Sequence, residues 1–142
     1  FFLEDKLVEA HARLETKESD SFAAHADAVL APEDATHALL KKIERLAPYG
    51  MQNPKPVFLL REIVVRDISR FGKSEEHLKL KIDTNEGQGS IDVVTFFVKG
   101  AIARATEALT QGSRANMLVH LERDTFARGN PVRLRLLDIR LV

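Results

Sequence analysis

The spacing of hydrophobic positions changes near the middle of the chain. In the first part, apolar residues recur every three or four positions, as on amphipathic helices, over about residues 1–14 and 32–47. In the second part, several runs alternate between apolar and polar residues, which is typical of strands with one buried face. The sequence therefore predicts a mainly helical segment followed by a β-rich one.

A weak strand pattern at residues 24–30 separates the two helices of the first part. We expect the second helix to begin at Pro32, because proline suits the first helical position, and to end near Ala47. The apolar face of this helix consists of Leu39, Ile43 and Leu46. The first part is thus predicted to be an α-β-α segment.

Residues 48–56 mark the boundary between the two parts. They contain three prolines and one glycine, so neither a helix nor a paired strand continues through them. A stretch so rich in proline is stiff. We therefore predict two units, residues 1–47 and 57–142, that are docked at a fixed angle by the linker 48–56.

The second unit shows five strand patterns and one helical pattern. The strands are expected at 57–71, 77–82, 91–98, 115–124 and 132–140, with a helix at about 100–111 that Gly112 caps. The order β-β-β-α-β-β is that of the OB-fold, a small Greek-key barrel. The predicted fold class is therefore mainly β with flanking helices: a five-stranded OB-fold barrel preceded by the α-β-α segment.

Charge is distributed unevenly along the chain. The 21 basic and 21 acidic residues cancel overall, yet residues 1–56 carry a net charge of −3 and residues 57–142 a net charge of +3. In a small barrel alternate side chains fill the interior. If Leu78, Leu80 and Ile82 point inward, Lys79 and Lys81 point outward. The same alternation in the last strand, with Val132, Leu134 and Leu136 inside, directs Arg133 and Arg135 outward.

Two loops place an aromatic residue beside a cation. Phe71 precedes Lys73 in the first loop, and Phe126 precedes Arg128 in the last one. Proteins that bind single strands combine cations that follow phosphates with aromatic rings that stack on bases. The sequence thus predicts a nucleic-acid-binding surface composed of Lys73, Lys79, Lys81, Phe126, Arg128, Arg133 and Arg135.

The alternative interpretation is that these cations form the solvated face of ordinary strands. Phe71 also has two interpretations, since its ring could stack on a base or turn into the barrel mouth. Packing roles are expected for Phe58, Phe96 and Phe97.

Several kinds of chemistry are not indicated by the sequence. The absence of cysteine excludes disulfides, thiolate zinc sites and cysteine nucleophiles, and agrees with a cytoplasmic location. The five histidines do not follow a metal-ligand spacing, and no phosphate-loop or nucleophile-elbow motif occurs. No apolar run approaches the ~18 residues of a membrane span. We therefore expect a soluble binding module with no membrane contact, no metal site and no catalytic residue.

One stretch closely resembles a known family. Residues 46–58, LAPYGMQNPKPVF, match the L-x-P-[FY]-G-x-x-N-P-x-P-x-F linker of the RecJ family of single-strand-specific DNA exonucleases, where it leads into an OB-fold. Residues 77–80, 136–140 and 27–30 are also similar to that family, so the resemblance covers about residues 22–142. Residues 1–14 would be a trailing helix of the preceding DHHA1-type region. Because the chain begins with Phe1, we interpret it as a piece of a longer protein.

The resemblance implies a parent enzyme that degrades single-stranded DNA from the 5′ end in DNA repair and recombination, with manganese or magnesium. The family's metal-binding motifs lie upstream of this chain, so no catalytic or metal residue is carried over and the isolated piece is expected to be inactive. Its implied role is to hold single-stranded DNA, with four cations on phosphates and Phe126 on a base. Those cations are Lys79, Lys81, Arg133 and Arg135.

Two other functions are compatible with the residues. In the first, the barrel docks a protein, either the catalytic domains or a single-strand-binding protein, and acidic neighbours engage the cations. In the second, the barrel binds RNA. Tyr49 and Asn53 of the linker are expected to form its turn, although both could face a substrate. The sequence does not indicate an oligomeric state.

Overall fold

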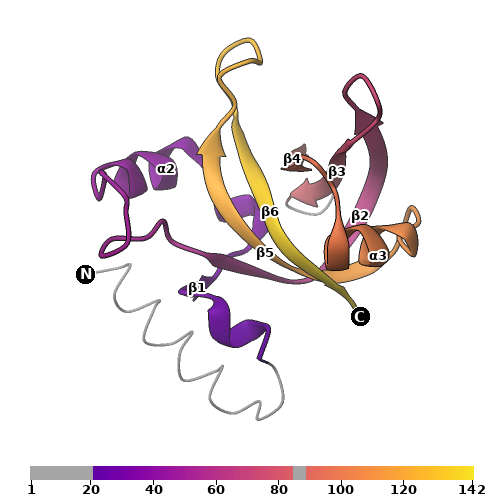
Figure 1. Ribbon diagram of the computed structural model, residues 1–142. Coiled ribbons are helices and arrows are strands. Elements are labelled where there is room, and N and C mark those ends of the chain that lie inside the picture. Colours follow the sequence, from indigo (N-terminus) through magenta and orange to yellow (C-terminus); the bar gives the residue numbers. More distant parts are fainter. Residues whose placement is uncertain (1–20, 85–88) are drawn as a thin grey trace.

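The computed structural model describes residues 21–84 and 89–142 (Figure 1). The predicted helix at residues 1–14 and the tip of the predicted hairpin at residues 85–88 lie outside the described residues. In the described part of the chain, no helix combines the length and the apolar content of a membrane span.

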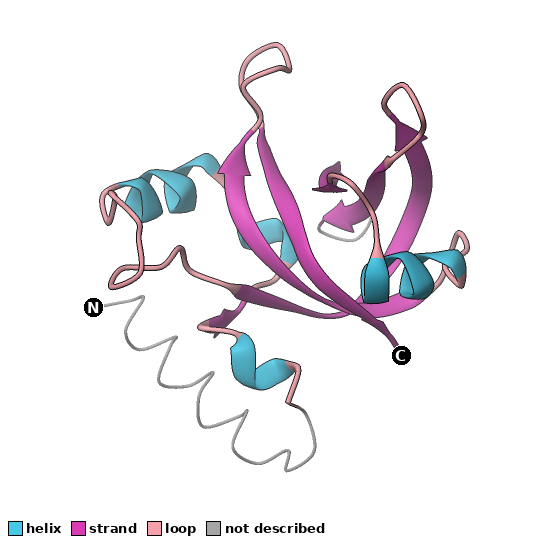
Figure 2. Cartoon of the chain, viewed as in Figure 1, coloured by secondary structure: helices cyan, strands magenta, loops and turns pink. Residues whose placement is uncertain are grey.

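Five strands form a closed barrel (Figure 2). They are β2 (Phe58–Phe71), β3 (His77–Thr84), β4 (Gly89–Thr95), β5 (Arg114–Arg123) and β6 (Val132–Leu141). Their spatial order is β2-β3-β4-β6-β5, and pairing of β2 with β5 closes the barrel. Only β4 and β6 are parallel among these pairs, and helix α3 (Gly100–Glu107) connects β4 to β5. This is the OB-fold, as predicted.

The length of β2 allows the barrel to close. Its 14 residues pair with β5 in their first half and with β3 in their second half. The register shifts between Leu60 and Ile63, where Glu62 has a positive φ of 49° and donates its N–H to Asn116 Oδ1 at 2.8 Å. Such a bulge bends a strand and increases its twist. β2 can therefore leave one neighbour and join the other.

The barrel core follows the predicted alternation. Leu78, Leu80 and Ile82 are at most 1% exposed, and Leu134 and Leu136 are buried beside the half-buried Val132. The prediction of which side chains fill the barrel is thus confirmed.

The second predicted helix begins later than the sequence analysis suggested. Pro32 starts a 3-10 turn, η2 (Pro32–Asp34), and the α-helix α2 spans His37–Glu44. Thr36 is its N-cap, since its Oγ1 accepts the N–H of Leu39 at 3.2 Å. Because the helix ends at Glu44, Leu46 is 47% exposed rather than part of the buried face, which Leu40 and Ile43 form.

The helix α3 is also shorter than predicted. It ends at Glu107, and Gly112 is not its cap. Gly112 lies in the following turn with a φ of 92°, and its N–H donates to the carbonyl oxygen of Val65 at 2.7 Å. The glycine is therefore required by the turn that enters β5.

The N-terminal segment adds to the barrel sheet. Strand β1 (Ala28–Val29) pairs in parallel with the start of β2, and a 3-10 turn, η1 (Ala23–His25), precedes it. The predicted strand at 24–30 is thus reduced to two residues. Phe22 and Ala23 pack on Leu59 and Leu118 in a second apolar cluster outside the barrel core. The division into the units 1–47, 48–56 and 57–142 stays a prediction.

Candidate nucleic-acid interface

Four rings gather where β2 ends, β3 begins and β4 has just ended. They are Phe71, His77, Phe96 and Phe97, which we call the aromatic cluster. Neighbouring ring centroids are 4.7–5.8 Å apart, in tilted or edge-to-face arrangements. These distances lie within the range in which aromatic pairs attract each other. The barrel therefore has an aromatic surface on strands that are adjacent in the sheet.

The backbone after β4 explains why Phe97 belongs to this cluster. Phe97 has a φ of 54°, so the chain turns out of the sheet and β4 ends at Thr95 instead of continuing to residue 98. The Phe97 N–H donates to His77 Nδ1 at 3.1 Å. Since Nδ1 accepts this bond, Nε2 carries the proton of the neutral ring, and it lies 3.4 Å from Glu76 Oε1. His77 thus connects the end of β4 to the β2–β3 loop.

Glu76 holds the β2–β3 loop in place. Its Oε2 accepts the N–H of Ser74 at 2.8 Å. The pKa of Glu76 is lowered first by its own backbone N–H, then by that of Ser74 and by the nearby His77. The carboxylate is therefore favoured in the charged form, and it orders the loop that follows Phe71.

Exposure separates the three phenylalanines that were expected to pack. Phe58 is 3% exposed and confirms the expectation, whereas Phe97 is 65% exposed and contradicts it; Phe96 is half-buried. Alternation from the buried Thr95 would instead place Phe97 inside the barrel, so strand periodicity does not predict its exposure. Phe71 does not belong to the barrel core and contacts His77 and Phe96 instead.

Three predicted cations border the aromatic cluster. Lys79 Nζ lies 5.7 Å from the Phe71 ring centroid, and the Cζ atoms of Arg135 and Arg133 lie 4.5 and 5.6 Å from that of Phe96. Cations attract aromatic faces at these distances. Lys79 pairs with Val94, which in turn pairs with Arg135, so both cations face the same outer side of the sheet. The structure therefore brings Lys79 of β3 and Arg135 of β6 to the same outer face, although they are far apart in the sequence.

Two of the predicted phosphate contacts are already engaged by acidic side chains. Glu122 Oε1 accepts from Arg135 Nε at 2.7 Å and from Arg133 Nε at 3.2 Å, and Arg133 Nη1 lies 3.4 Å from Asp124 Oδ1. The Arg133 side chain is only 11% exposed. Arg133 and Arg135 are therefore paired with carboxylates, as in the alternative in which acidic neighbours engage the cations, and their contact with phosphates stays a prediction. The physical reason is the register, which places Glu122 directly opposite Arg133.

The remaining predicted residues lie on loops and on β3. Phe126 is 92% exposed at the tip of the β5–β6 hairpin, which projects at the top of Figure 1. Asp124 Oδ1 accepts the N–H groups of Phe126 and Ala127 at 3.0 and 3.2 Å and so shapes this tip. Phe126 makes no ring contact with another described residue. The other three residues are exposed and form no ion pair within the described ranges: Lys73, Lys81 and Arg128.

The linker forms the predicted turn. The hydroxyl of Tyr49 donates to the carbonyl oxygen of Ile43, and Asn53 Nδ2 donates to the carbonyl oxygens of Leu46 and Pro48 at 2.6 and 2.9 Å. Burial, with a smaller contribution from Glu44, raises the pKa of Tyr49. Tyr49 thus satisfies a carbonyl group in the last turn of α2, and Asn53 satisfies two that follow it, as expected for residues that form the turn.

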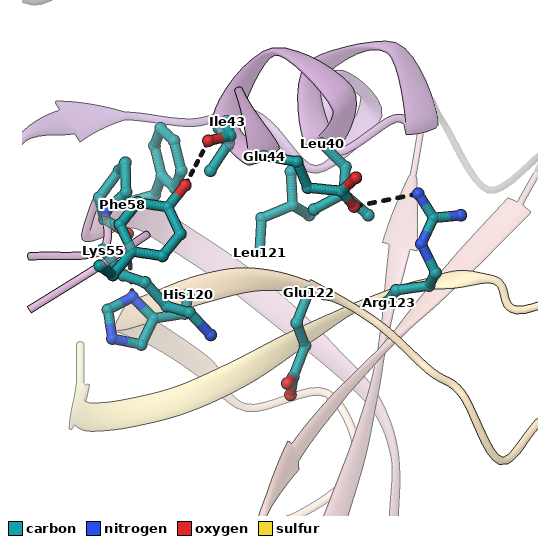
Figure 3. A pocket seen from close by; sticks show the side chains of 11 residues that line it. Leu40, Ile43, Glu44, Lys55, Phe58, His120, Leu121, Glu122 and Arg123 are labelled. Atoms are coloured by element: carbon teal, nitrogen blue, oxygen red, sulfur yellow. Dashed lines mark hydrogen bonds and ion pairs between the residues drawn. The ribbon is translucent and has the colours of Figure 1, made fainter. Parts of the chain in front are cut away.

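A small pocket lies between α2, the linker and β5. It has a volume of about 140 Å³, and Figure 3 shows Leu40, Lys55 and His120 among its lining residues. An ion pair of 3.0 Å between Glu44 and Arg123 joins α2 to β5 at its edge. In residues 21–84 and 89–142, no three His, Cys, Asp or Glu side chains are grouped as they would be to hold a metal ion.

Comparisons with known proteins agree with this fold. The single-stranded-DNA-specific exonuclease RecJ of Bacillus subtilis (strain 168) is 33% identical over 92 residues, which are 65% of this chain and 11% of that protein. The crystal structures of RecJ from Thermus thermophilus with Mg²⁺ and with Mn²⁺ have TM-scores of 0.59 and 0.57 at 19% identity. Each covers 92% of this chain, which spans 19% and 18% of those RecJ chains.

A family model described as the RecJ OB domain matches residues 26–138, which include the linker, β2 to β5, most of β6 and the aromatic cluster. The chain therefore belongs to the RecJ OB domain family, as its linker motif implied.

Proposed function

We propose that this chain is the single-stranded-DNA-binding module of a 5′-to-3′ single-strand-specific DNA exonuclease that acts in DNA repair and recombination in the cytoplasm. Membership of the RecJ OB domain family and the name of the B. subtilis relative support the proposal. The observation that carries it is the aromatic cluster, bordered by Lys79 and Arg135 on one outer face of the barrel. The chain supplies no catalytic residue, and other parts of the enzyme would hold the Mn²⁺ or Mg²⁺.

The chemistry of the surface suits a nuclease that accepts any sequence. Such an enzyme must keep hold of its strand through contacts that do not depend on base identity. Stacking on aromatic rings and attraction between cations and phosphates both meet this requirement. The exposed ring of Phe97 provides the first kind of contact, and the cations of β3 and the loops that form no ion pair with a described residue provide the second.

The proposal predicts a measurable dependence of affinity on salt. We expect the chain to bind a fluorescein-labelled oligothymidylate in an anisotropy titration. Four cations of β3 and the loops form no ion pair with a described residue: Lys73, Lys79, Lys81 and Arg128. If they neutralise four phosphates, the logarithm of the association constant should fall against the logarithm of salt with a slope of roughly −2.8.

Substitution of a single lysine makes this test specific. Lys81→Ala should weaken binding and reduce the magnitude of the slope by about 0.7. Lys41→Ala on α2 is a matched control, because Lys41 is also exposed, and it should leave both quantities unchanged. An oligonucleotide that fails to bind at low salt would contradict the proposed function.

A second function, protein docking, has one observation in its favour. Arg133 and Arg135 are paired with Glu122, as expected for a surface that is not prepared for phosphates. The docked partner would be the catalytic part of the enzyme or a single-strand-binding protein. DNA binding with a flat salt dependence, unaffected by Lys81→Ala, would favour this function. Competition with an RNA of equal length tests the RNA-binding alternative.

A further inference from the structure

We propose that Arg135 is a stacking platform for a nucleobase and not a contact to phosphate, and that Arg135 and Phe96 together form one base subsite. This inference rests on the proposed function and assigns a role to one residue within it.

Glu122 fixes the orientation of the Arg135 guanidinium group. Arg135 Nε and Nη2 donate to Glu122 Oε1 and Oε2 at 2.7 and 3.2 Å, which makes the pair bidentate. Two N–H···O bonds of this kind hold a planar guanidinium in one plane. Glu122 Oε1 also accepts from Arg133 Nε at 3.2 Å, so the carboxylate is held from two sides. The platform is therefore rigid before any ligand arrives.

The Arg135 guanidinium lies against the Phe96 ring, and part of the Arg135 side chain is exposed to solvent. The Arg135 Cζ atom lies 4.5 Å from the Phe96 centroid, yet 36% of the Arg135 side chain is exposed. Arg135 borders a surface hollow of about 420 Å³, whose lining also includes Lys55, Phe96 and His120. A base can therefore enter beside the guanidinium and extend the stack that Phe96 begins.

Charge favours a base over a phosphate at this position. Glu122 offsets the charge of Arg135 and lines the same hollow, so an incoming phosphate would meet a carboxylate. A neutral base meets no such repulsion, and guanidinium planes stack well on bases. Bases also lie between phosphates along a strand. Lys55 at the hollow and Lys79 beside Phe71 provide cations for the flanking phosphates.

Two substitutions at Arg135 separate the two roles. Arg135→Lys keeps the positive charge but removes the planar guanidinium group. Arg135→Gln keeps a planar group, the amide, but removes the charge. Each is titrated with a labelled oligothymidylate of about 15 nucleotides, within the length that one OB-fold covers, and with a strand of equal length in which every base is replaced by an abasic spacer. Arg66→Lys is the matched control, since Arg66 also pairs with a carboxylate, Asp83, at 2.8 Å and forms no cation–π pair within the described residues.

For a stacking platform, Arg135→Lys weakens oligothymidylate binding at least about fivefold, Arg135→Gln weakens it less, and neither changes the salt slope. The abasic strand binds both variants as it binds the wild type, and Arg66→Lys has no effect on either strand. Thermal melting of each variant checks that the barrel is folded. If either Arg135 variant does not fold, Phe96→Leu is measured in its place, and it should weaken oligothymidylate binding without a change of slope.

The opposite ranking overturns the inference. Any one of three results would show that Arg135 contacts phosphate. Arg135→Lys could bind like the wild type, Arg135→Gln could lower the magnitude of the slope by about 0.7, or the abasic strand could show the same loss of affinity as oligothymidylate. A wild-type chain that binds neither strand would instead contradict the proposed function itself. The two failures are thus distinguishable.

Discussion

At the residue scale, the carboxylate of Glu76 connects the β2–β3 loop to the aromatic cluster. Glu76 accepts backbone N–H groups on one side and faces His77 Nε2 on the other. His77 in turn accepts the N–H of Phe97. One ionised side chain thus fixes the positions of rings on two different elements.

This arrangement predicts a stability difference that depends on pH. The pKa of Glu76 in the folded chain is below its ordinary value of 4.5, so its stabilising contribution is present above pH 4.5 and is lost as the pH falls through the folded pKa. Glu76→Gln keeps an oxygen that can accept the Ser74 N–H and removes only the charge. We expect the variant to unfold at a lower urea concentration than the wild type near neutral pH, and the difference to shrink below pH 4.5 and vanish once the pH is below the folded pKa.

Glu75→Gln is the matched control for this measurement. The Glu75 carboxylate is exposed and makes no hydrogen bond with a described residue, so its replacement should leave the urea midpoint unchanged at both pH values. A difference between Glu76→Gln and the wild type that stays constant down to acidic pH would show that charge is not the cause.

Part of the candidate site could be predicted from the sequence. Strand alternation is a local property, and it correctly placed Lys79 and Arg135 on the outer face. The ionic partners of a side chain depend on strand register, which the alternation of a single strand does not contain. For this reason the pairing of Arg135 with Glu122 was not predicted. The exposed ring of Phe97 was missed because a positive φ ends β4 early.

At the element scale, Asn53 stabilises the junction between α2 and the barrel. Its side-chain amide donates to the carbonyl oxygens of Leu46 and Pro48. Its backbone N–H and carbonyl groups form two hydrogen bonds with those of Gly50. These bonds satisfy carbonyl groups that follow the last turn of α2, in a segment where prolines supply no N–H donors.

Removal of the Asn53 amide tests this role. Asn53→Ala deletes two hydrogen bonds, and we expect the free energy of unfolding in urea to fall by about 1–2 kcal/mol. Gln52→Ala is the control, because Gln52 is exposed and makes no hydrogen bond with a described residue; its effect should stay within about 0.5 kcal/mol. Equal effects of the two substitutions would indicate that the amide does not stabilise the turn.

The types and order of the barrel elements were predictable, whereas several boundaries were not. A period of two residues identifies strands directly, and the five strands and the intervening helix occur in the predicted order. Helix starts depend on which residue supplies the cap. Pro32 and Thr36 both suit a helix start, and the hydroxyl of Thr36 makes the capping bond. Gly112 resembles a helix cap in sequence, but the N–H that it donates to Val65 is a tertiary contact.

At the scale of the whole molecule, the segment before the linker and the barrel share one sheet. β1 extends the sheet at β2, and Figure 1 shows α2 beside β5. Phe22 is 2% exposed against Leu59 and Leu118, and the Arg140 guanidinium lies 5.0 Å from its ring centroid. The contacts of Phe22 therefore join the first described residues to β2 and β5 through apolar packing and to β6 through a cation–π pair.

Phe22→Ala tests whether this contact makes the segment and the barrel a single folding unit. Loss of a buried phenylalanine costs about 3–5 kcal/mol, and we expect one cooperative transition that shifts by that amount when unfolding is followed by both circular dichroism and Tyr49 fluorescence. Tyr49 reports on the linker, because it is the only tyrosine in the chain. Phe126→Ala makes the same chemical change at a side chain that is 92% exposed, so it should alter stability by less than about 0.5 kcal/mol and act only on oligonucleotide binding. If Phe22→Ala instead splits unfolding into two transitions, or leaves the barrel transition unshifted, the linker at 48–56 separates two independent folding units.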